Sequence, residues 1–520
     1  MEIELKFLIS PTDINKVQHA IVDSPYQVEH KPTLTLANAY YDTPENALRH
    51  WDFGLRTRTT STDDGNVAAE QTVKLSGQDV AGLQQRPEFT VAVPLNDNEA
   101  AFANLSLFDT GIWPEDFPAQ QINQDLNKVF ETTFERKVWN LHLTNGALVE
   151  CVLDQGQIEA EFEGEMQSEP LCELELELIE GKVNDLFEIA YYFTHKVPAK
   201  LGLLSKAARG YHLAQGKQLT IKNLETIEYK GKSSLEPAFV NILNYAVEFI
   251  QHNEIVFAQD KRPKSFRRIM DGVSLVIQVL ELFKPYLPET SCELYIEKFK
   301  QWRGQASWIE PFYQLEKMCG RKSPYRNDME SSESILHMLT ERQTPNDRIE
   351  QAIKEFSSAE FNQMFLEFIQ WLSNKSWRSE MPLENLNNLT APIKPIAEQW
   401  LDEAWHELKD KIKQVDLNGD RTTIENAYWA LAAGLLTGVA VSGFYAGEQR
   451  LIFRSHLLNI LLGLEEAILL SKLRTILMED NESDIDDEQN SLKWLNSKQT
   501  SLNMALTVSI DAMIKLKPYW

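Results

Sequence analysis

The first residues after the initiator methionine alternate between charged and apolar side chains. They read Glu2-Ile3-Glu4-Leu5-Lys6-Phe7. Because successive side chains on a β-strand point to opposite faces, Glu2, Glu4 and Lys6 would share one face. Hard divalent cations bind carboxylate oxygens, and phosphate oxygens bind fixed positive charge. One strand face with two carboxylates and an ammonium group is therefore suited to a metal ion and a phosphate group.

A single segment of this kind is more often a solvent-exposed strand face, so recurrence decides between the two interpretations. The charged residues that recur with a period of two before residue 210 are Arg56, Arg58, Lys74, Arg86, Glu88, Glu150, Asp154, Glu173, Glu175 and Glu177. Acids gather in some segments and bases in others, and neighbouring like charges repel unless a counter-ion lies between them. We therefore predict a β-barrel with these rows inside it, which is a polar tunnel that binds a ligand.

Eight short motifs follow one another in the first 215 residues. They are Glu2-x-Glu4-x-Lys6, Tyr40-Tyr41-Asp42-Thr43-Pro44, Leu55-Arg56-x-Arg58, Val73-Lys74, Arg86-x-Glu88, Leu153-Asp154-x-Gly156, Glu173-Leu174-Glu175-Leu176-Glu177-Leu178 and Ser205-Lys206-Ala207-Ala208-Arg209-Gly210. This ordered set resembles the CYTH superfamily, the triphosphate tunnel metalloenzymes. The stretches 84–88, 172–178 and 205–213 resemble most closely the bacterial inorganic triphosphatases, which carry a helical CHAD domain behind the CYTH domain.

The resemblance implies a fold of the α+β class. We expect a closed antiparallel β-barrel at residues 1–215, a linker at 216–234, and an all-α helical bundle at 235–520 that is a degenerate CHAD-like domain. Within the barrel region, helical insertions are expected at 13–22, 99–107 and 183–196. A polar, lysine-rich composition marks the linker, and apolar residues at helical spacing begin soon after it, at Phe239, Leu243, Ala246 and Ile250.

The resemblance also implies a role for each charged residue. The expected ligands of Mg2+ or Mn2+ are Glu2, Glu4, Glu175 and Glu177. Asp154 and Glu88 would hold a second ion or orient basic neighbours. The residues expected to bind the phosphate chain are Lys6, Arg56, Arg58, Lys74, Arg86, Arg136 and Lys206. Either a second metal ion, or Lys6 as a base with Tyr40 nearby, would activate water, and the sequence leaves both routes open. Arg209 also matches the family motif and is expected to be a structural partner of an acid.

One pair of basic residues departs from the family pattern. After Phe134 the family shows two bases in alternate positions, whereas Arg136 and Lys137 are adjacent here. With regular alternation Arg136 points into the barrel and Lys137 points outward, unless a β-bulge shifts the register. The tunnel is therefore expected to have one cation fewer than its relatives.

The activity implied by the resemblance is metal-dependent hydrolysis of inorganic tripolyphosphate to pyrophosphate and phosphate. Phosphoryl transfer requires positioning, charge neutralisation and an in-line water rather than a covalent nucleophile. The enzymatic alternatives are hydrolysis of thiamine triphosphate or a nucleoside triphosphate, and cyclisation of ATP as in adenylate cyclases of the superfamily. The alternative outside enzymes is a polyphosphate-binding scaffold, but a pure polyanion binder has no need of the acidic rows.

Composition limits the partners and the compartment. The chain has 520 residues, enough for two or three cores, and a net charge of −26 that argues against a nucleic-acid-binding protein. Its four cysteines form no CxxC pair, which argues against a structural zinc site or a disulfide framework. No signal segment precedes Glu2, so we expect a cytoplasmic protein without a membrane partner.

Three features of the second half bear on its partners. Residues 221–520 hold 34 basic and 43 acidic residues, which argues against the polyphosphate contact that the resemblance suggests for this domain. The uncharged stretch 427–446 is long enough to reach across a bilayer, but its alanines and glycines favour a helix buried within the protein. The acidic stretch 479–488 is expected to be a disordered surface loop.

Overall fold

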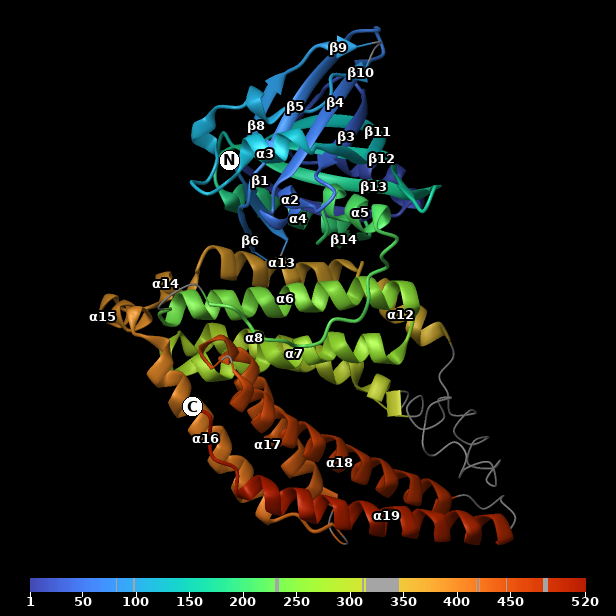
Figure 1. Ribbon diagram of the computed structural model, residues 1–520, viewed down its shortest axis with the longest axis vertical. Helices are drawn as coiled ribbons and strands as arrows, with labels where there is room; N and C mark the ends of the chain where they lie inside the picture. The colour runs from blue at the N-terminus through green and yellow to red at the C-terminus, as the bar shows by residue number, and fades with distance from the viewer. Residues whose placement is uncertain are drawn as a thin grey trace. The chain divides into compact units, whose positions relative to one another are not determined.

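The computed structural model describes the chain apart from residues 81, 97–98, 230–232, 311–312, 315–345, 418, 420, 446 and 480–484. It divides into two compact units. The first unit comprises Met1–Thr220 and Glu350–Ser376, and the second comprises Ile221–Ile349 and Trp377–Trp520. The first is built around a β-sheet and the second is helical (Figure 1).

The first unit contains one large antiparallel sheet. Its main strands are β1 (Glu2–Ile9), β3 (Leu34–Asp42), β4 (Gly54–Thr62), β5 (Val67–Lys74), β7 (Leu83–Arg86), β8 (Glu88–Ala92), β11 (Asn127–His142), β12 (Leu148–Phe162) and β13 (Glu165–Glu180). They pair in the order β7-β1-β13-β12-β11-β3-β4-β5-β8, with β6 (Gln78–Val80) beside β7. Short strands β2 (Gln27–His30) and β14 (Ala199–Leu201) pair with β11 and β1. Figure 1 shows these strands, coloured blue to green, curling around one another.

The two strands at the ends of this order are consecutive in sequence and joined by Pro87. Residues 83–86 pair with β1, and residues 88–92 pair with β5. Proline has no N–H for a strand ladder, so it suits the point at which the segment changes partner. Its carbonyl oxygen accepts a hydrogen bond of 2.9 Å from the backbone N–H of Leu75. This bent segment nearly closes the barrel, which confirms the architecture predicted from the sequence.

The alternation of side chains along β1 and β13 separates a polar interior from an apolar exterior. Leu5, Phe7, Leu174 and Leu176 are completely buried. Helix α4 (Val183–Lys196) packs against both strands, and α1 (Ile14–Val22) and α13 (Ala359–Ser373) pack against α4. The apolar residues of the two strands are thus covered by helices, and their charged neighbours face the barrel interior.

Two of the three predicted helical insertions are confirmed, and one is wrong. Helices α1 and α4 lie within the stretches 13–22 and 183–196. The stretch 99–107 instead contains the short strand β10 (Glu99–Ala100) and a single 3-10 turn, Leu105–Leu107. The side chain of Gln71 bonds both the N–H and the carbonyl of Asn104, at 2.6 and 2.9 Å. These tertiary bonds hold the backbone before the turn in an extended form, which local propensity does not reveal.

Gly156 on β12 permits a close approach of β11. A Cβ added at this position would lie 2.0 Å from the carbonyl oxygen of Thr133 and 2.5 Å from Cα of Phe134. Because these are backbone atoms that cannot rotate away, Gly156→Ala is expected to lower the free energy of unfolding by about 2 kcal/mol. Urea titration measures this, with Gly54→Ala as the control because an added Cβ there meets nothing within 4 Å. Equal stability of the two variants would contradict the steric argument.

The second unit is a helical bundle, as the sequence predicted. Its main helices are α6 (Leu235–Asp260), α7 (Pro263–Phe283), α8 (Glu289–Gln305), α16 (Ile393–Lys413), α17 (Arg421–Ala440), α18 (Glu448–Glu479) and α19 (Ile485–Ile514). Helix α6 packs on α7 and α7 on α8, and α16 to α19 pack in sequence. The predicted apolar stripe Phe239, Leu243, Ala246 and Ile250 is completely buried on α6.

Two further expectations concern this unit. In the part of the chain that the structure describes, no helix has the length and hydropathy of a membrane span, and this includes α17 in the uncharged stretch. Of the acidic stretch 479–488, residues 480–484 lie outside the described residues. Glu479 ends α18 and Ile485 begins α19, so the expected loop is wrong for the residues that the structure does describe there.

Candidate active site

A cavity of about 360 Å³ lies inside the barrel. The predicted site residues that line it are Glu2, Glu4, Lys6, Tyr40, Arg56, Arg58, Lys74, Arg86, Arg136, Glu175, Glu177 and Lys206. The other two predicted residues, Glu88 and Asp154, lie behind this wall and form ion pairs with cations that line it. The barrel therefore brings residues as far apart in sequence as Glu2 and Lys206 into one polar cavity.

A first group of charges connects β1, β4, β5 and β8. The Lys74 ammonium donates a hydrogen bond of 2.5 Å to Glu2 and lies 3.2 Å from Glu88. Glu88 is in turn 3.6 Å from the Arg56 guanidinium. Burial raises the pKa of Glu88, but Lys74 and Arg56 outweigh burial and lower it to about 2. Glu88 thus stays ionised and holds the two cations at the wall of the cavity.

A second feature is a set of carboxylates that lie next to one another. Glu4 on β1 lies directly opposite Glu177 on β13, and Glu150 on β12 lies on the other side of Glu177. Burial, with the charge of Glu4 adding to it, raises the pKa of Glu177 to about 7. Burial also raises the pKa of Glu2 to about 7 although Lys74 opposes the shift. Glu2 and Glu177 therefore resist ionisation, and a divalent cation would remove this penalty.

The carboxylates of the cavity fit a hard divalent cation that takes its remaining ligands from water and from the substrate. Among the residues whose placement is described, no three His, Cys, Asp or Glu side chains form a ready metal cluster. Mg2+ does not require one, since it keeps several waters and binds one or two carboxylates together with substrate phosphates. Glu4 and Glu177, in register on adjacent strands with Glu2 nearby, provide such carboxylates.

A buried ion network surrounds Asp154, which is completely inaccessible to solvent. Arg136 donates two hydrogen bonds to its carboxylate, from Nε at 2.7 Å and from Nη2 at 2.6 Å. The Lys206 ammonium lies 2.8 Å from the same carboxylate. Burial raises the pKa of Asp154, but Arg136 and Lys206 outweigh burial and lower it. Both oxygens are therefore occupied by cations, so the geometry favours the orienting role over the metal-ligand role for Asp154.

Glu175 belongs to the same network. Its Oε1 accepts a hydrogen bond of 2.7 Å from Lys206 and lies 3.6 Å from Lys6, and its Oε2 accepts one of 3.1 Å from Arg136. Burial raises the pKa of Glu175, but Lys206 and Lys6 outweigh burial and hold it well below its usual range. Although Glu175 and Glu177 occupy the same face of β13, the structure places Glu175 among cations and Glu177 among carboxylates.

Two further basic residues of the network differ in their surroundings. The Lys6 ammonium is 3.6 Å from Glu175 and 4.0 Å from Glu173, and the residue is 3 % exposed. Arg209 donates a hydrogen bond of 2.7 Å to Glu173 and another of 2.7 Å to Glu169. Arg209 does not line the cavity, so it has the partnership with acids that the sequence predicted.

The remaining predicted cations are held individually. Arg58 Nε donates a hydrogen bond of 2.7 Å to Asn38, and burial lowers the pKa of Arg58 to about 9. The Arg86 guanidinium lies 3.3 Å from Asp52, and the ring of Tyr40 stacks on Phe130 with centroids 4.5 Å apart. These contacts orient Arg58, Arg86 and Tyr40 along the wall of the cavity.

The structure also resolves the unusual pair of adjacent bases on β11. Arg136 lines the cavity, whereas Lys137 does not and lies 3.5 Å from Glu135. The pairing of β11 with β12 runs through both residues without a register shift. The predicted orientation of Arg136 and Lys137 is confirmed, and no bulge brings Lys137 into the cavity.

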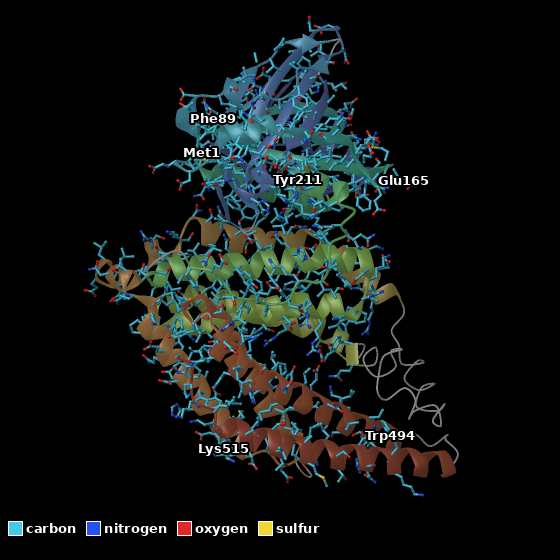
Figure 2. All side chains as sticks on the ribbon, in the orientation of Figure 1. Met1, Phe89, Glu165, Tyr211, Trp494 and Lys515 are labelled. Carbon is cyan, nitrogen blue, oxygen red and sulfur yellow. The ribbon has the colours of Figure 1, made fainter. Side chains whose placement is uncertain are left out.

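Sequence reasoning missed Arg49 and Tyr211, which also line the cavity. Arg49 lies on α2 (Ala47–His50) and Tyr211 on α5 (Lys206–Ala214), so neither belongs to an alternating strand. Figure 2 labels Tyr211 on α5 beside the strands of the barrel. The available signal was Asp42 in the Tyr-Tyr-Asp-Thr-Pro motif, because its carboxylate accepts hydrogen bonds from the Tyr211 hydroxyl at 2.7 Å and the Arg49 N–H at 3.0 Å.

Comparison with known proteins identifies relatives of the barrel region. Residues 1–211 match the CYTH domain. An inorganic triphosphatase from Haemophilus influenzae is 34% identical over 221 residues, which cover 42% of this chain and 56% of the relative. The chain thus spans little more than half the length of this relative.

Two solved structures are similar at low scores. A CHAD domain from Ricinus communis is 14% identical, covering 57% of this chain and 98% of the other, with a TM-score of 0.40. A protein from Pyrococcus horikoshii is 17% identical, covering 36% of this chain and 84% of the other, with a TM-score of 0.23. Scores below 0.5 carry no weight for function, so the CHAD-like character of residues 235–520 stays a prediction.

Proposed function

Residues 1–211 match the CYTH domain, and from this premise we propose that the chain hydrolyses inorganic tripolyphosphate to pyrophosphate and phosphate. The observation that supports this most directly is the cavity wall, which carries eight cations and also two carboxylates, Glu2 and Glu177, that resist ionisation. A linear polyphosphate matches the cations, and a divalent cation accompanying it matches the carboxylates.

In this proposal the buried network positions the phosphate chain. Lys206 and Arg136 are fixed by Asp154 and Glu175 before any substrate arrives, so little reorganisation is needed when charge develops on the phosphate oxygens. Arg56 and Arg58 present planar guanidinium groups that suit bidentate contact with phosphate oxygens. Lys6, Lys74 and Arg86 complete the set of cations along the chain.

We assign Glu2, Glu4 and Glu177 to Mg2+ or Mn2+, which when bound would neutralise phosphate charge as a Lewis acid. Glu175, predicted as a metal ligand, and Asp154, predicted to hold a second ion or to orient basic neighbours, both contact cations and are assigned to orienting them. Glu88 holds Lys74 and Arg56 in the same manner. This division places metal binding and phosphate binding on different parts of one wall.

The position of Lys6 bears on how water is activated. Its ammonium lies between Glu173 and Glu175, so losing its proton would leave two buried carboxylates with less compensation. This favours phosphate binding by Lys6 over a role as general base. Tyr40 faces the cavity beside Arg56, where it would orient the guanidinium or the phosphate chain.

Phosphate release from tripolyphosphate, ATP and thiamine triphosphate, each with EDTA, Mg2+ or Mn2+, tests the proposal. We expect metal-dependent turnover, with kcat/KM for tripolyphosphate at least about tenfold above that for ATP or thiamine triphosphate. The reason is that the cavity wall offers cations along the whole length of the polyphosphate chain. Preference for ATP or thiamine triphosphate would favour the alternative hydrolases, and cyclic AMP as product would indicate a cyclase. Tight binding without turnover would favour the scaffold.

A further inference from the structure

Arg49 differs from the other cations that line the cavity in having no carboxylate partner among the described residues. Eight cations line the wall, and seven of them lie within 4.0 Å of a carboxylate. Within the described part of the chain, no carboxylate forms an ion pair with the Arg49 guanidinium. Its Nη1 is buried and has no hydrogen-bond partner. Arg49 therefore brings to the lining of the polar cavity a guanidinium charge that no described carboxylate pairs with.

The guanidinium of Arg49 is nevertheless held in a defined place. It stacks on the ring of Tyr211, with Cζ 4.6 Å from the ring centroid. The Tyr211 hydroxyl donates a hydrogen bond of 2.7 Å to Asp42, and burial raises the pKa of Tyr211 so that the hydroxyl keeps its proton. Asp42 also accepts from the backbone N–H of Arg49 at 3.0 Å. One buried carboxylate thus orients both the helix that bears Arg49 and the ring that supports it.

A guanidinium without a carboxylate partner is stabilised when an anion binds beside it. The other cations already contact carboxylates, so a phosphate group must compete with those contacts, whereas at Arg49 it would gain a charge-assisted hydrogen bond without breaking one. The acceptors that the proposed reaction brings into this cavity are the oxygens of a polyphosphate chain.

We propose that Arg49 is a further substrate-binding residue, whose guanidinium donates a hydrogen bond to an oxygen of the polyphosphate chain while Tyr211 holds it in place. The inference rests on the proposed function, because it takes tripolyphosphate as the ligand of the cavity. It adds to the predicted set a cation that reaches the cavity from the connection between β3 and β4, not from a strand.

Calorimetric titration with tripolyphosphate in EDTA tests this without turnover. Arg49→Gln is expected to raise Kd about tenfold, and Arg49→Lys about threefold because it keeps the charge and loses the planar donor. Tyr211→Phe keeps the ring and removes the bond to Asp42, so we expect a rise of about threefold. Lys137→Gln, outside the cavity, is the matched control and should leave Kd unchanged.

Steady-state kinetics with Mg2+ separates binding from a structural role. If Arg49 binds substrate, Arg49→Gln raises KM about tenfold and leaves kcat within about threefold, with an unchanged melting temperature. Kd and KM within about twofold of the wild type would overturn the inference alone. A melting temperature that falls while Kd and KM stay the same would assign Arg49 to folding. Absence of tripolyphosphate binding by the wild type would overturn both this inference and the proposed function.

Discussion

The Glu177→Gln variant is expected to be more stable than the wild type at pH 8 in EDTA, and yet to lose about 10²–10³-fold in kcat for tripolyphosphate. Burial and Glu4 raise the pKa of Glu177 from 4.5 to about 7 in the folded protein. The ionised carboxylate therefore destabilises the metal-free protein, and the neutral amide removes that penalty. The same substitution removes an oxygen ligand that we assign to the metal ion.

The ionisation of Glu177 determines how the stability difference between the variant and the wild type changes with pH. Between pH 4.5 and about 7 the folded protein holds a proton on Glu177 that the unfolded chain releases, so the wild type loses stability as pH rises. The advantage of Glu177→Gln should be full above pH 7 and absent below about pH 4.5. Urea titrations at pH 4, 5 and 8 measure it.

An acid outside the cavity provides the control for Glu177→Gln. Glu131 on β11 is 48 % exposed and pairs with Lys128 at 2.7 Å. Glu131→Gln should change the free energy of unfolding by less than about 0.5 kcal/mol and leave kcat intact. Adding Mg2+ at pH 8 should raise the melting temperature of the wild type more than that of Glu177→Gln. A less stable variant, or one with wild-type kcat, would contradict the assignment of Glu177.

Replacing Asp154 by asparagine is expected to lower the free energy of unfolding by about 3–5 kcal/mol at neutral pH, the usual cost of breaking a buried ion pair. The amide keeps the shape of the carboxylate but leaves Arg136 and Lys206 with less compensation. Because the folded-state pKa of Asp154 lies below its usual value, its contribution is present above pH 3.8 and disappears as pH falls through the folded-state pKa. Urea titrations at several pH values measure the loss.

Metal titration distinguishes the two roles predicted for Asp154. If Asp154 orients cations, the Asp154→Asn enzyme has a lower kcat/KM and the Mg2+ concentration for half-maximal rate is unchanged. If Asp154 were a metal ligand, that concentration would rise about tenfold or more. Asp63→Asn, in an exposed turn, should alter neither stability nor activity. A stability loss below about 1 kcal/mol for Asp154→Asn would contradict the buried network.

The sequence predicted which residues face the cavity because side-chain alternation along a strand is a local property. Glu2, Glu4 and Lys6 line one wall, as their spacing indicated. Arg136 faces inward and Lys137 outward for the same reason. No knowledge of the rest of the chain is needed for such statements, so they hold wherever the strand itself is correctly recognised.

The partners of these residues could not be predicted, because they depend on the stagger between strands. Glu175 and Glu177 look equivalent in sequence, but they meet cations and carboxylates respectively. Arg49 lies on a helix of four residues, too short for a periodic signal. The sequence likewise assigned all of residues 235–520 to one helical domain, whereas Glu350–Ser376, which include α13, belong to the same unit as the barrel.

The bent segment around Pro87 links completion of the fold to completion of the site. Arg86 pairs with Glu2 on one side of the bend, and Glu88 pairs with Lys74 on the other. The first charge group therefore forms only when this segment joins both edges of the sheet, across a large separation in sequence from β13. Such non-local pairing is slow compared with helix formation. During refolding, the helical circular-dichroism signal should therefore recover before the proposed hydrolytic activity does. The time at which activity returns would then report the last step of barrel assembly.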